Sequence, residues 1–204
     1  MFNLIADLVA ALCVLVMLVA VVCNFLNTQQ TREFKERRSP VATASMTAFF
    51  LLLYCTIRFR WSALDLSGLL VFRSFGLALM LFGAAFNVWG RLYLKTNWAD
   101  HVRIYDDQTL ITTGPYRIVR HPLYASIIWM FYGASIAYLN PLAAIENTLI
   151  FIPAMIYRSN LEENELRKTF GETFSNYWKN TGRFFPRIGR KLSLHPSISP
   201  KIGK

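Results

Sequence analysis

Residues 8–26, LVAALCVLVMLVAVVCNFL, contain no charged side chain, and this stretch decides the class of the protein. An apolar run of about 18 residues or more is long enough to cross a bilayer as a helix. A signal peptide would place a basic segment ahead of a shorter apolar core, whereas the first basic residue here is Arg32, after the run. The stretch therefore predicts a retained transmembrane helix, extended at its start by residues 2–6.

Four further apolar runs follow, and the composition agrees with them. Hydrophobic residues make up 54% of the 204 positions and charged residues only 17%, against about a quarter in soluble domains. The runs are residues 41–57, 66–94, 123–139 and 142–157, the last of them interrupted by Glu146 and Pro153. Strands span membranes only as closed barrels of alternating segments, and these runs do not alternate. The fold class is therefore predicted as all-α, a polytopic membrane protein with about five transmembrane helices and a cytoplasmic C-terminal helical segment. Asn140 and Pro141 leave room only for a tight hairpin between the last two helices.

The basic residues indicate an orientation rather than a nucleic-acid partner. The net charge is +10, but with five spans all but three of the 22 basic residues fall on one side of the membrane. The exceptions are Arg58, Arg60 and Arg73. Lys and Arg are enriched in cytoplasmic loops, so the C-terminal half is expected in the cytoplasm, where its excess charge meets anionic lipid headgroups. No nucleic acid is expected as a partner. Three cysteines lie inside apolar runs without metal-ligand spacing, so no metal site is expected either.

Polar chemistry is confined to two stretches on that side, residues 96–120 and the segment from Arg158 onward. His121 precedes Pro122, so it is expected at the N-cap of the fourth span, with Pro122 as the first helical residue. The free amides of that helix end can hold an anion, or Arg120 and His121 can simply anchor the helix among headgroups. Arg158 and Glu162 are spaced i, i+4, which fits either a surface ion pair or charges held at the membrane edge for function.

The two stretches together resemble the isoprenylcysteine carboxyl methyltransferase family and, more broadly, the phospholipid methyltransferase group. The resemblance covers roughly residues 96–186, and its central element is an Arg-His-Pro-x-Tyr motif followed by a hydrophobic hairpin and a Glu-Glu pair. The matching residues are Asn97, Trp98, 109–116, Arg120, His121, Pro122, Leu123, Tyr124, Arg158, Glu162, Glu163, Phe170, Gly171, Tyr177 and 181–186. Residues 1–95 add three transmembrane helices and no motif, and residues 187–204 form a basic flexible tail. The methyltransferase core is thus predicted as residues 96–186.

The resemblance implies an S-adenosylmethionine-dependent methyltransferase whose cofactor is held by cytoplasmic segments. The residues it assigns to the cofactor are Gln108, Thr109, Leu110, Ile111, Tyr116, His121, Pro122, Leu123, Tyr124 and Glu162. It assigns Arg158 to the acceptor substrate. This chain departs from the family at Gln108, where His is common, and at Ser126, where Gly is common and an added side chain could narrow the site. Both departures bear on the acceptor more than on the cofactor.

The residue types favour a carboxylate as the methyl acceptor. A carboxylate is already ionised at neutral pH and needs no general base, whereas an amine or a thiol often does. Arg158 stays protonated, and the placement of His121 favours a role in orienting a ligand. The expected acceptor is therefore an isoprenylated cysteine or a similar prenyl-type lipid. A lipid amine or small thiol acceptor and a non-enzymatic membrane subunit remain alternatives, and the sequence leaves the oligomeric state open.

Overall fold

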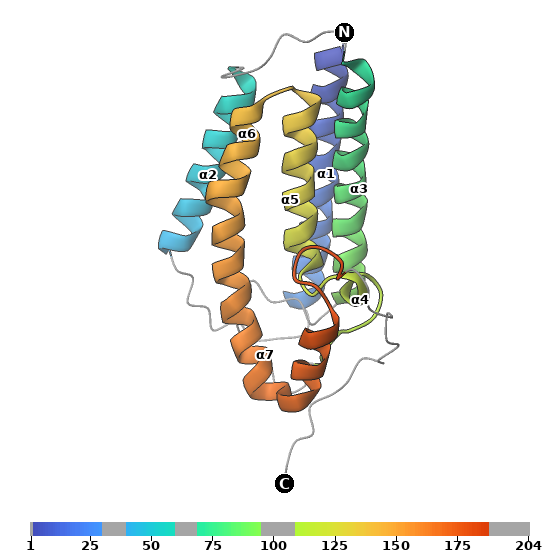
Figure 1. Cartoon of the computed structure of the whole chain (residues 1–204), viewed down its shortest axis with the longest axis vertical. Coiled ribbons are helices and arrows are strands. Elements are labelled where there is room, and N and C mark those ends of the chain that lie inside the picture. Colours follow the sequence, from blue (N-terminus) through green and yellow to red (C-terminus); the bar gives the residue numbers. More distant parts are fainter. Residues whose placement is uncertain (1, 30–39, 60–68, 95–108, 188–204) are drawn as a thin grey trace.

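The computed structural model describes residues 2–29, 40–59, 69–94 and 109–187. These residues are mostly helical and contain no extended strand, which confirms the all-α class. The helices are α1 (Phe2–Gln29), α2 (Pro40–Arg58), α3 (Leu70–Leu94), α4 (Pro115–Ile118), α5 (Pro122–Ala137), α6 (Pro141–Glu146) and α7 (Ile152–Asn180). The long helices run along one axis, with α1, α3 and α5 grouped together and α2 beside α6 (Figure 1).

Helices occupy all five positions where apolar runs predicted them, with small shifts at the ends. The third begins at Leu70, and the fourth ends at Ala137 because Leu139 adopts a turn conformation with φ of 51°. Two of them, α1 over Phe2–Cys23 and α3, are long and apolar enough to cross a membrane, with mean hydropathy of 2.9 and 1.6. The apolar helices Ala48–Arg58 and Pro122–Ala137 are shorter. The count of five spans therefore stays a prediction.

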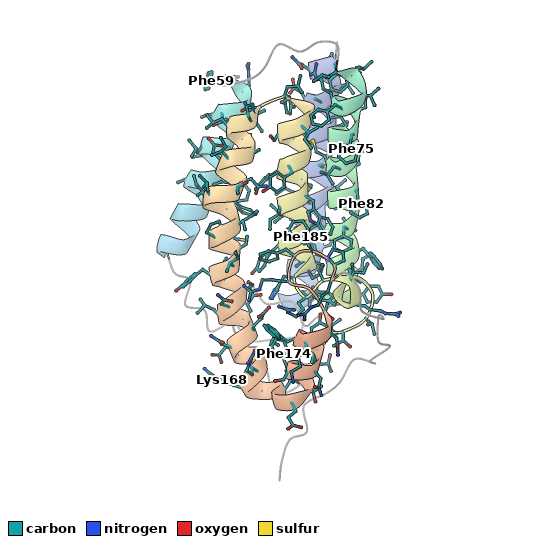
Figure 2. All side chains as sticks on the ribbon, viewed as in Figure 1. Phe59, Phe75, Phe82, Lys168, Phe174 and Phe185 are labelled. Atoms are coloured by element: carbon teal, nitrogen blue, oxygen red, sulfur yellow. The ribbon has the colours of Figure 1, made fainter. Side chains whose placement is uncertain are left out.

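Glycines let α3 and α5 approach until their backbones touch. A Cβ added at Gly76 would lie 2.5 Å from the Ala137 nitrogen and 2.6 Å from the Gly133 oxygen. One added at Gly83, seven residues further along α3, would lie 2.5 Å from the Met130 side chain. Small residues at such spacing form a flat stripe that allows close helix packing in membranes. Beside this stripe α3 carries large exposed side chains such as Phe75 and Phe82, labelled in Figure 2, and the Phe82 ring stacks on Trp129 of α5.

Polar contacts fasten α1 at the end of the bundle where α3 begins. Arg73 donates from Nε to the carbonyl oxygen of Ala137 at 2.9 Å and from its terminal nitrogen to the Asn3 side chain. Its guanidinium also lies 4.1 Å from the centre of the Phe2 ring. Arg73 thus satisfies the end of α5 and holds the first turn of α1 against it.

The hairpin between α5 and α6 forms as the Asn-Pro pair predicted. Asn140 is the N-cap of α6, and its side-chain oxygen accepts a hydrogen bond from the Ala143 nitrogen at 3.2 Å. A π-helical turn, Asn147–Phe151, then joins α6 to α7, so that the last apolar run is not a regular α-helix. A proline ring inside an α-helix clashes with the carbonyl four residues earlier, which for Pro153 lies in this wider turn. The irregular turn explains how the run continues through Pro153.

Two kinds of contact dock α2 onto this hairpin. Phe49 stacks on Phe151 with 5.0 Å between ring centres, inside the largest buried apolar cluster. Near the end of α2 the Thr56 hydroxyl donates to Oε1 of the buried Glu146 at 2.6 Å. The second contact places a carboxyl group between two helices of the bundle.

Helix α7 runs beyond the bundle and then turns back at Gly171. This glycine has φ of 54° and ψ of −123°, a conformation that side chains other than hydrogen rarely allow. The returning half carries Phe174 and Tyr177 inward, where they pack with Leu110 and Phe170. Figure 1 shows the returning half close to α4 and the start of α5, and Figure 2 labels Phe174 in this turn. The reversal brings the end of the described chain to the motif residues.

Candidate active site

The start of α5 has the predicted local structure. His121 is its N-cap, with φ of −123°, and Pro122 is its first helical residue. Arg120 and His121 are only 9% and 7% exposed, so they do not reach out as anchors among headgroups, and that alternative is wrong. Both side chains point into the protein and meet Glu163 in the first half of α7, and Arg120 also donates to the Trp178 oxygen in the returning half.

Residues 181–186, which we call the C-terminal strap, close over this helix start. The Arg120 nitrogen donates to the Gly182 oxygen at 2.8 Å, and the His121 nitrogen donates to the Arg183 oxygen at 3.1 Å. These bonds accompany a parallel bridge between Val119 and Gly182. A Cβ at Gly182 would lie 1.9 Å from the Phe185 oxygen, so only glycine fits this turn of the strap. The strap fixes the backbone on both sides of the Arg-His pair.

The carboxylate of Glu163 is the centre of the polar network beneath the strap. Its Oε1 accepts hydrogen bonds from Arg120 Nε and His121 Nε2, both at 3.0 Å. Its Oε2 accepts from Trp178 Nε1 at 2.9 Å and from an Arg183 nitrogen at 3.1 Å. The Glu163 side chain is only 6% exposed. Its four donors come from the start of α5, the returning half of α7 and the strap. One buried carboxylate therefore joins the start of α5, both halves of α7 and the strap.

Electrostatics within the network favour charged partners. Burial alone would raise the pKa of Glu163, but the hydrogen bond from His121 and the charge of Arg120 outweigh it and hold the pKa at about 2. Burial alone would lower the pKa of His121, but hydrogen bonds to Glu162 and Glu163 outweigh it and raise that pKa above its ordinary value. A protonated imidazole donates from both ring nitrogens and cannot accept a proton. The raised pKa of His121 therefore favours the form in which both ring nitrogens donate, one toward Glu162 and one to Glu163.

Glu162, Tyr124 and Arg158 form a second, more open group beside it. The Tyr124 hydroxyl donates to Glu162 Oε1, and His121 Nδ1 lies 3.4 Å from Glu162 Oε2. The Arg158 guanidinium lies 5.9 Å from the centre of the Tyr124 ring, so Tyr124 contacts both Arg158 and Glu162, the two residues spaced i, i+4 on α7. The Glu162 side chain is 29% exposed, against 6% for Glu163. Glu162 therefore remains accessible to a ligand while Glu163 does not.

Tyr116 and Leu110 support this group from the other polar stretch. The carbonyl oxygen of Tyr116 accepts a hydrogen bond from the Tyr177 hydroxyl at 2.6 Å. Burial raises the pKa of the Tyr116 phenol well above its ordinary value, Glu162 raises it further, and Arg91 opposes the rise. Tyr116 thus lies within the electrostatic reach of both a carboxylate and a guanidinium. Leu110 is buried among the aromatic side chains of α7.

The remaining predicted residues fall in three groups. Gln108 lies outside the described residues, and Thr109 and Ile111 are partly buried next to Leu110. Pro122 and Leu123 pack against α3, because a Cβ at Gly90 would lie 3.6 Å and 3.0 Å from them. Their side chains support the site from the bundle side. The structure therefore brings His121, Tyr124, Glu162 and Arg158 together and leaves the roles of all predicted site residues as predictions.

Sequence reasoning assigned a role to Glu162 and none to Glu163, Trp178 or Arg183. The Glu-Glu pair was a signal that one carboxylate is internal, and the neighbouring Arg-His pair supplied its natural partners. The spacing could not say which of the two glutamates faces inward. Trp178 and Arg183 carried no signal, because their contact with Glu163 depends on the reversal at Gly171.

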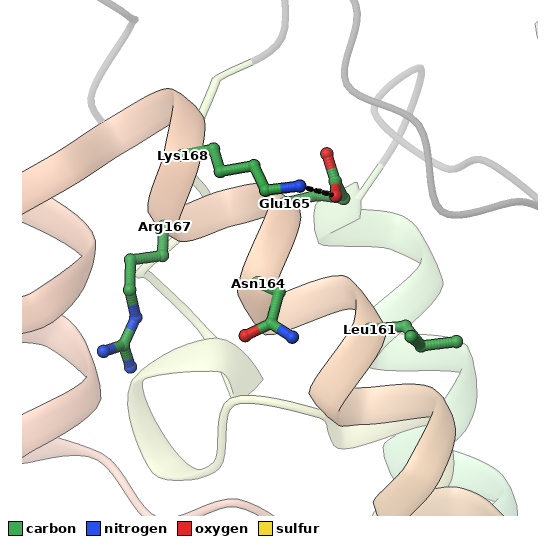
Figure 3. A pocket seen from close by; sticks show the side chains of 5 residues that line it. All are labelled: Leu161, Asn164, Glu165, Arg167 and Lys168. Carbon is green, nitrogen blue, oxygen red and sulfur yellow. Dashed lines mark hydrogen bonds and ion pairs between the residues drawn. The ribbon is translucent and has the colours of Figure 1, made fainter.

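A separate surface pocket of about 660 Å³ lies on α7. It is lined by Leu161, Asn164, Glu165, Arg167 and Lys168 (Figure 3). Lys168 donates to Glu165 across it at 2.6 Å. Its lining contains none of the predicted site residues, so it is distinct from the group around Glu162.

Comparison with known proteins matches the middle of the chain to a family. The profile of the phospholipid methyltransferase family matches residues 71–173, a little over half of the chain. A probable protein-S-isoprenylcysteine O-methyltransferase from Oryza sativa subsp. indica is 31% identical over 115 residues, which are 55% of this chain and 60% of the rice protein. A methanethiol S-methyltransferase from Pseudomonas deceptionensis is 27% identical over 116 residues, 50% of this chain and 43% of that protein.

A solved structure has the same fold. The eukaryotic intramembrane Ras methyltransferase, isoprenylcysteine carboxyl methyltransferase, superposes with a TM-score of 0.55 at 22% identity, covering 76% of this chain and 55% of that one. The chain thus aligns with about 60% or less of the length of these relatives. The matched residues include α5 with its N-cap and the first half of α7, which carry His121, Tyr124, Arg158, Glu162 and Glu163.

Proposed function

Because this chain belongs to the phospholipid methyltransferase family, we propose that it is an integral membrane methyltransferase that uses S-adenosylmethionine. We further propose that it methylates the carboxylate of an isoprenylated cysteine or a similar prenyl-type lipid. The observation that carries this proposal is the convergence of His121, Tyr124, Glu162 and Arg158 at one end of an apolar helical bundle. That arrangement places polar groups next to an apolar helical surface, which suits an amphipathic acceptor.

The residues around Glu162 fit a methyl donor that carries positive charge. S-adenosylmethionine, when bound, supplies a methyl group made electrophilic by a positive sulfur atom. Glu162 offers a partly exposed carboxylate, and the neighbouring Tyr124 offers an aromatic ring, both of which attract cations. Tyr116 and the segment from Thr109 to Ile111 would line the same cofactor. The buried Glu163 would hold His121 in place and make no contact with the ligand.

Arg158 is proposed to receive the carboxylate of the acceptor. A guanidinium binds a carboxylate through two parallel hydrogen bonds, which fixes its direction as well as its position. Since the acceptor is already ionised, the reaction needs alignment of the two reactants and no proton transfer. The protonated state favoured for His121 agrees with a reaction that has no general base.

A second candidate acceptor is a small thiol. The Pseudomonas deceptionensis relative is a methanethiol S-methyltransferase, and it covers the same region of this chain. A thiol must lose a proton before or during methylation, so this reaction would require a base. Within the described site only the two glutamates and His121 could take that role.

We also propose five transmembrane spans with the site in the cytoplasm. The two spans that meet the length criterion, the shorter apolar helices and the distribution of basic residues support this topology. A reporter fused after Lys204 should be active only if it functions in the cytoplasm. Activity of a reporter that works only outside the cytoplasm would contradict the orientation.

The central experiment uses detergent-purified protein, radiolabelled S-adenosylmethionine and three acceptors. These are a farnesylated cysteine analogue, an aminophospholipid and a small thiol. Label in an alkali-labile product from the first acceptor supports the carboxylate proposal, since methyl esters hydrolyse in alkali and methylamines and thioethers do not. Label only in an alkali-stable product would replace that acceptor.

Cofactor binding needs its own control. Calorimetry should detect S-adenosylhomocysteine binding by the wild type and a large loss in Glu162→Ala. Glu165→Ala is the matched control, because Glu165 lies on the same helix with a side chain 41% exposed and outside the proposed site. Absence of binding in the wild type would contradict the enzyme proposal and favour a non-enzymatic membrane subunit.

A further inference from the structure

A chain of buried polar side chains crosses from α5 to α3 and ends at Arg91. The Asn87 side-chain nitrogen donates to Ser126 Oγ at 2.7 Å and to the Leu123 oxygen at 3.3 Å. Arg91 Nε donates to the Asn87 side-chain oxygen at 2.9 Å. Asn87 and Ser126 are fully buried and Arg91 is 9% exposed. Polar groups inside a membrane bundle are costly, so a connected set of them calls for a function.

This chain of contacts has a direction. Both acceptors on α5 hold the nitrogen of the Asn87 amide, so its oxygen must face the other way, toward Arg91. Ser126 contributes its own hydrogen bond to the Leu123 oxygen at 2.7 Å, which fixes its hydroxyl. Ser126 stands where relatives often have glycine, and here its added side chain occupies the contact between α3 and α5. The serine and the asparagine therefore determine where the guanidinium of Arg91 lies.

The last turns of α3 lie against the candidate cofactor residues. Gly90 packs on Pro122 and Leu123 at the start of α5, and a Cβ there would lie 3.0 Å from Leu123. Tyr93 packs under Gly114, where a Cβ would lie 2.5 Å from the Tyr93 ring. Arg91 lies between these two contacts in the sequence of α3. The charge of Arg91 lowers the pKa of the buried Tyr116 phenol, whereas the charge of Glu162 raises it.

We propose that Arg91 is a further cofactor-binding residue, whose guanidinium receives the α-carboxylate of the methyl donor while Glu162 receives the donor's cationic groups. Asn87 and Ser126 are positioning residues that aim Arg91. The amino-acid end of the donor carries an ammonium, a sulfonium and a carboxylate, so a complementary site needs one cation as well as one anion. Glu162 alone would repel the carboxylate. This inference rests on the proposed function, because it assumes that S-adenosylmethionine is the donor.

The test compares two ligands that differ only in the carboxylate. S-adenosylhomocysteine and its decarboxylated analogue are titrated calorimetrically into wild type, Arg91→Gln and Arg91→Lys. Arg91→Gln should weaken S-adenosylhomocysteine binding by about tenfold or more, the usual size of a charge-assisted contact, and should change the affinity for the decarboxylated analogue less than about twofold. Arg91→Lys keeps the charge and should lose less, with an unfolding temperature close to that of wild type.

Ser126→Gly tests the positioning residues. In the wild-type background it should lower the affinity for S-adenosylhomocysteine by a few-fold. In Arg91→Gln it should cause no further loss of affinity, because Ser126 acts through Arg91. A purely structural role would instead weaken both ligands equally in every variant, and that result overturns the inference. A raised KM for the prenylated acceptor in Arg91→Gln, with unchanged S-adenosylhomocysteine affinity, would move Arg91 to the acceptor carboxylate and also overturn it. Failure of the wild type to bind either ligand would contradict the proposed function itself.

Discussion

Glu163 and Glu146 lie on one continuous run of helix, about five turns apart, and their surroundings differ sharply. Glu163 accepts four hydrogen bonds, from Arg120, His121, Trp178 and Arg183. Glu146 is equally buried, yet it accepts one bond, from Thr56, and its Oε2 has no partner among the described residues. Both oxygens of Glu163 are fully hydrogen-bonded, and Glu163 lies at the end of the bundle that carries the candidate site. At the other end a carboxyl group serves only to join α2 to α6.

The comparison teaches that burial alone does not identify a functional carboxylate. A buried acidic side chain inside a membrane protein is a candidate site by default. What separates these two is the number of chain segments that converge on each. Glu163 connects α5, both halves of α7 and the C-terminal strap, whereas Glu146 connects two helices. We therefore expect mutations at the two glutamates to differ by orders of magnitude in their effect on cofactor binding.

Glu163→Ala should have the largest effect of any single change. It leaves Arg120, His121 and Arg183 without their shared partner, and breaking a buried ion pair costs about 3–5 kcal/mol. We expect at least about a hundredfold loss of S-adenosylhomocysteine affinity and a lower unfolding temperature, measured by calorimetry and thermal denaturation. Glu163→Gln, which keeps the volume and one acceptor, should fall between Glu163→Ala and wild type. Binding within about threefold of wild type in Glu163→Ala would remove the contrast between the two glutamates.

Arg158→Lys should come next and should spare cofactor binding. An ammonium cannot make the two parallel bonds that a guanidinium makes to a carboxylate. We expect at least about a tenfold loss in kcat/KM for a farnesylated cysteine analogue, equivalent to about 1.4 kcal/mol, at unchanged S-adenosylhomocysteine affinity. Near-wild-type kinetics would show that Arg158 contributes only a helix-surface charge.

Acid should weaken the Glu163 end of the molecule selectively. The pKa of Glu163 is about 2 in the folded protein and near 4.5 when unfolded, so its contribution is complete above 4.5 and is lost as pH falls toward 2. A difference of one in pKa corresponds to about 1.4 kcal/mol, so the whole loss is on the order of 3 kcal/mol. Thermal unfolding between pH 5 and pH 2 should show a steeper decline in wild type than in Glu163→Gln. Parallel pH dependences of the unfolding temperature in the two proteins would mean that ionised Glu163 does not stabilise the fold.

Glu146→Gln should have the smallest effect. Glutamine keeps an oxygen to accept from Thr56 and replaces the second carboxyl oxygen, which has no partner among the described residues. S-adenosylhomocysteine affinity should stay within about twofold of wild type, and the unfolding temperature should be unchanged or higher. A large loss of binding here would show that the two ends of the bundle are coupled, and the contrast drawn above would fail.

Local patterns were enough to predict the helices, the Asn-Pro hairpin and the N-cap at His121. Hydropathy and the Pro-containing pairs act over a few residues, so they need no knowledge of the fold. The inward-facing glutamate was beyond such reasoning. The π-helical turn, Asn147–Phe151, holds more residues per turn than an α-helix and therefore rotates the faces of α7 relative to α6. The spacing of apolar residues does not predict this rotation. The rotation changes which side of α7 faces the bundle, and so which of Glu162 and Glu163 is buried.

The strap escaped prediction for a different reason. Its backbone bonds to Arg120 and His121 pair residues that are far apart in the chain and that meet only because α7 reverses at Gly171. Phe170 and Gly171 were recognised as part of a motif, but the motif does not predict that α7 reverses its direction at Gly171. The role of Ser126 was hidden likewise, since its partner Asn87 lies on another helix.

The bridge between Val119 and Gly182 can form only after the strap has been synthesised, so it has a consequence for folding during translation. Arg120 leaves the peptidyl-transferase centre 61 residues before Thr181, whose carbonyl it binds. At translation rates of about 5–20 residues per second, this separation amounts to roughly 3–12 seconds. Helices α1, α2, α3 and α5 are therefore all synthesised before Arg120 and His121 can meet their partners in the strap. The polar site is completed only once the strap has been synthesised, after the helices that surround the site.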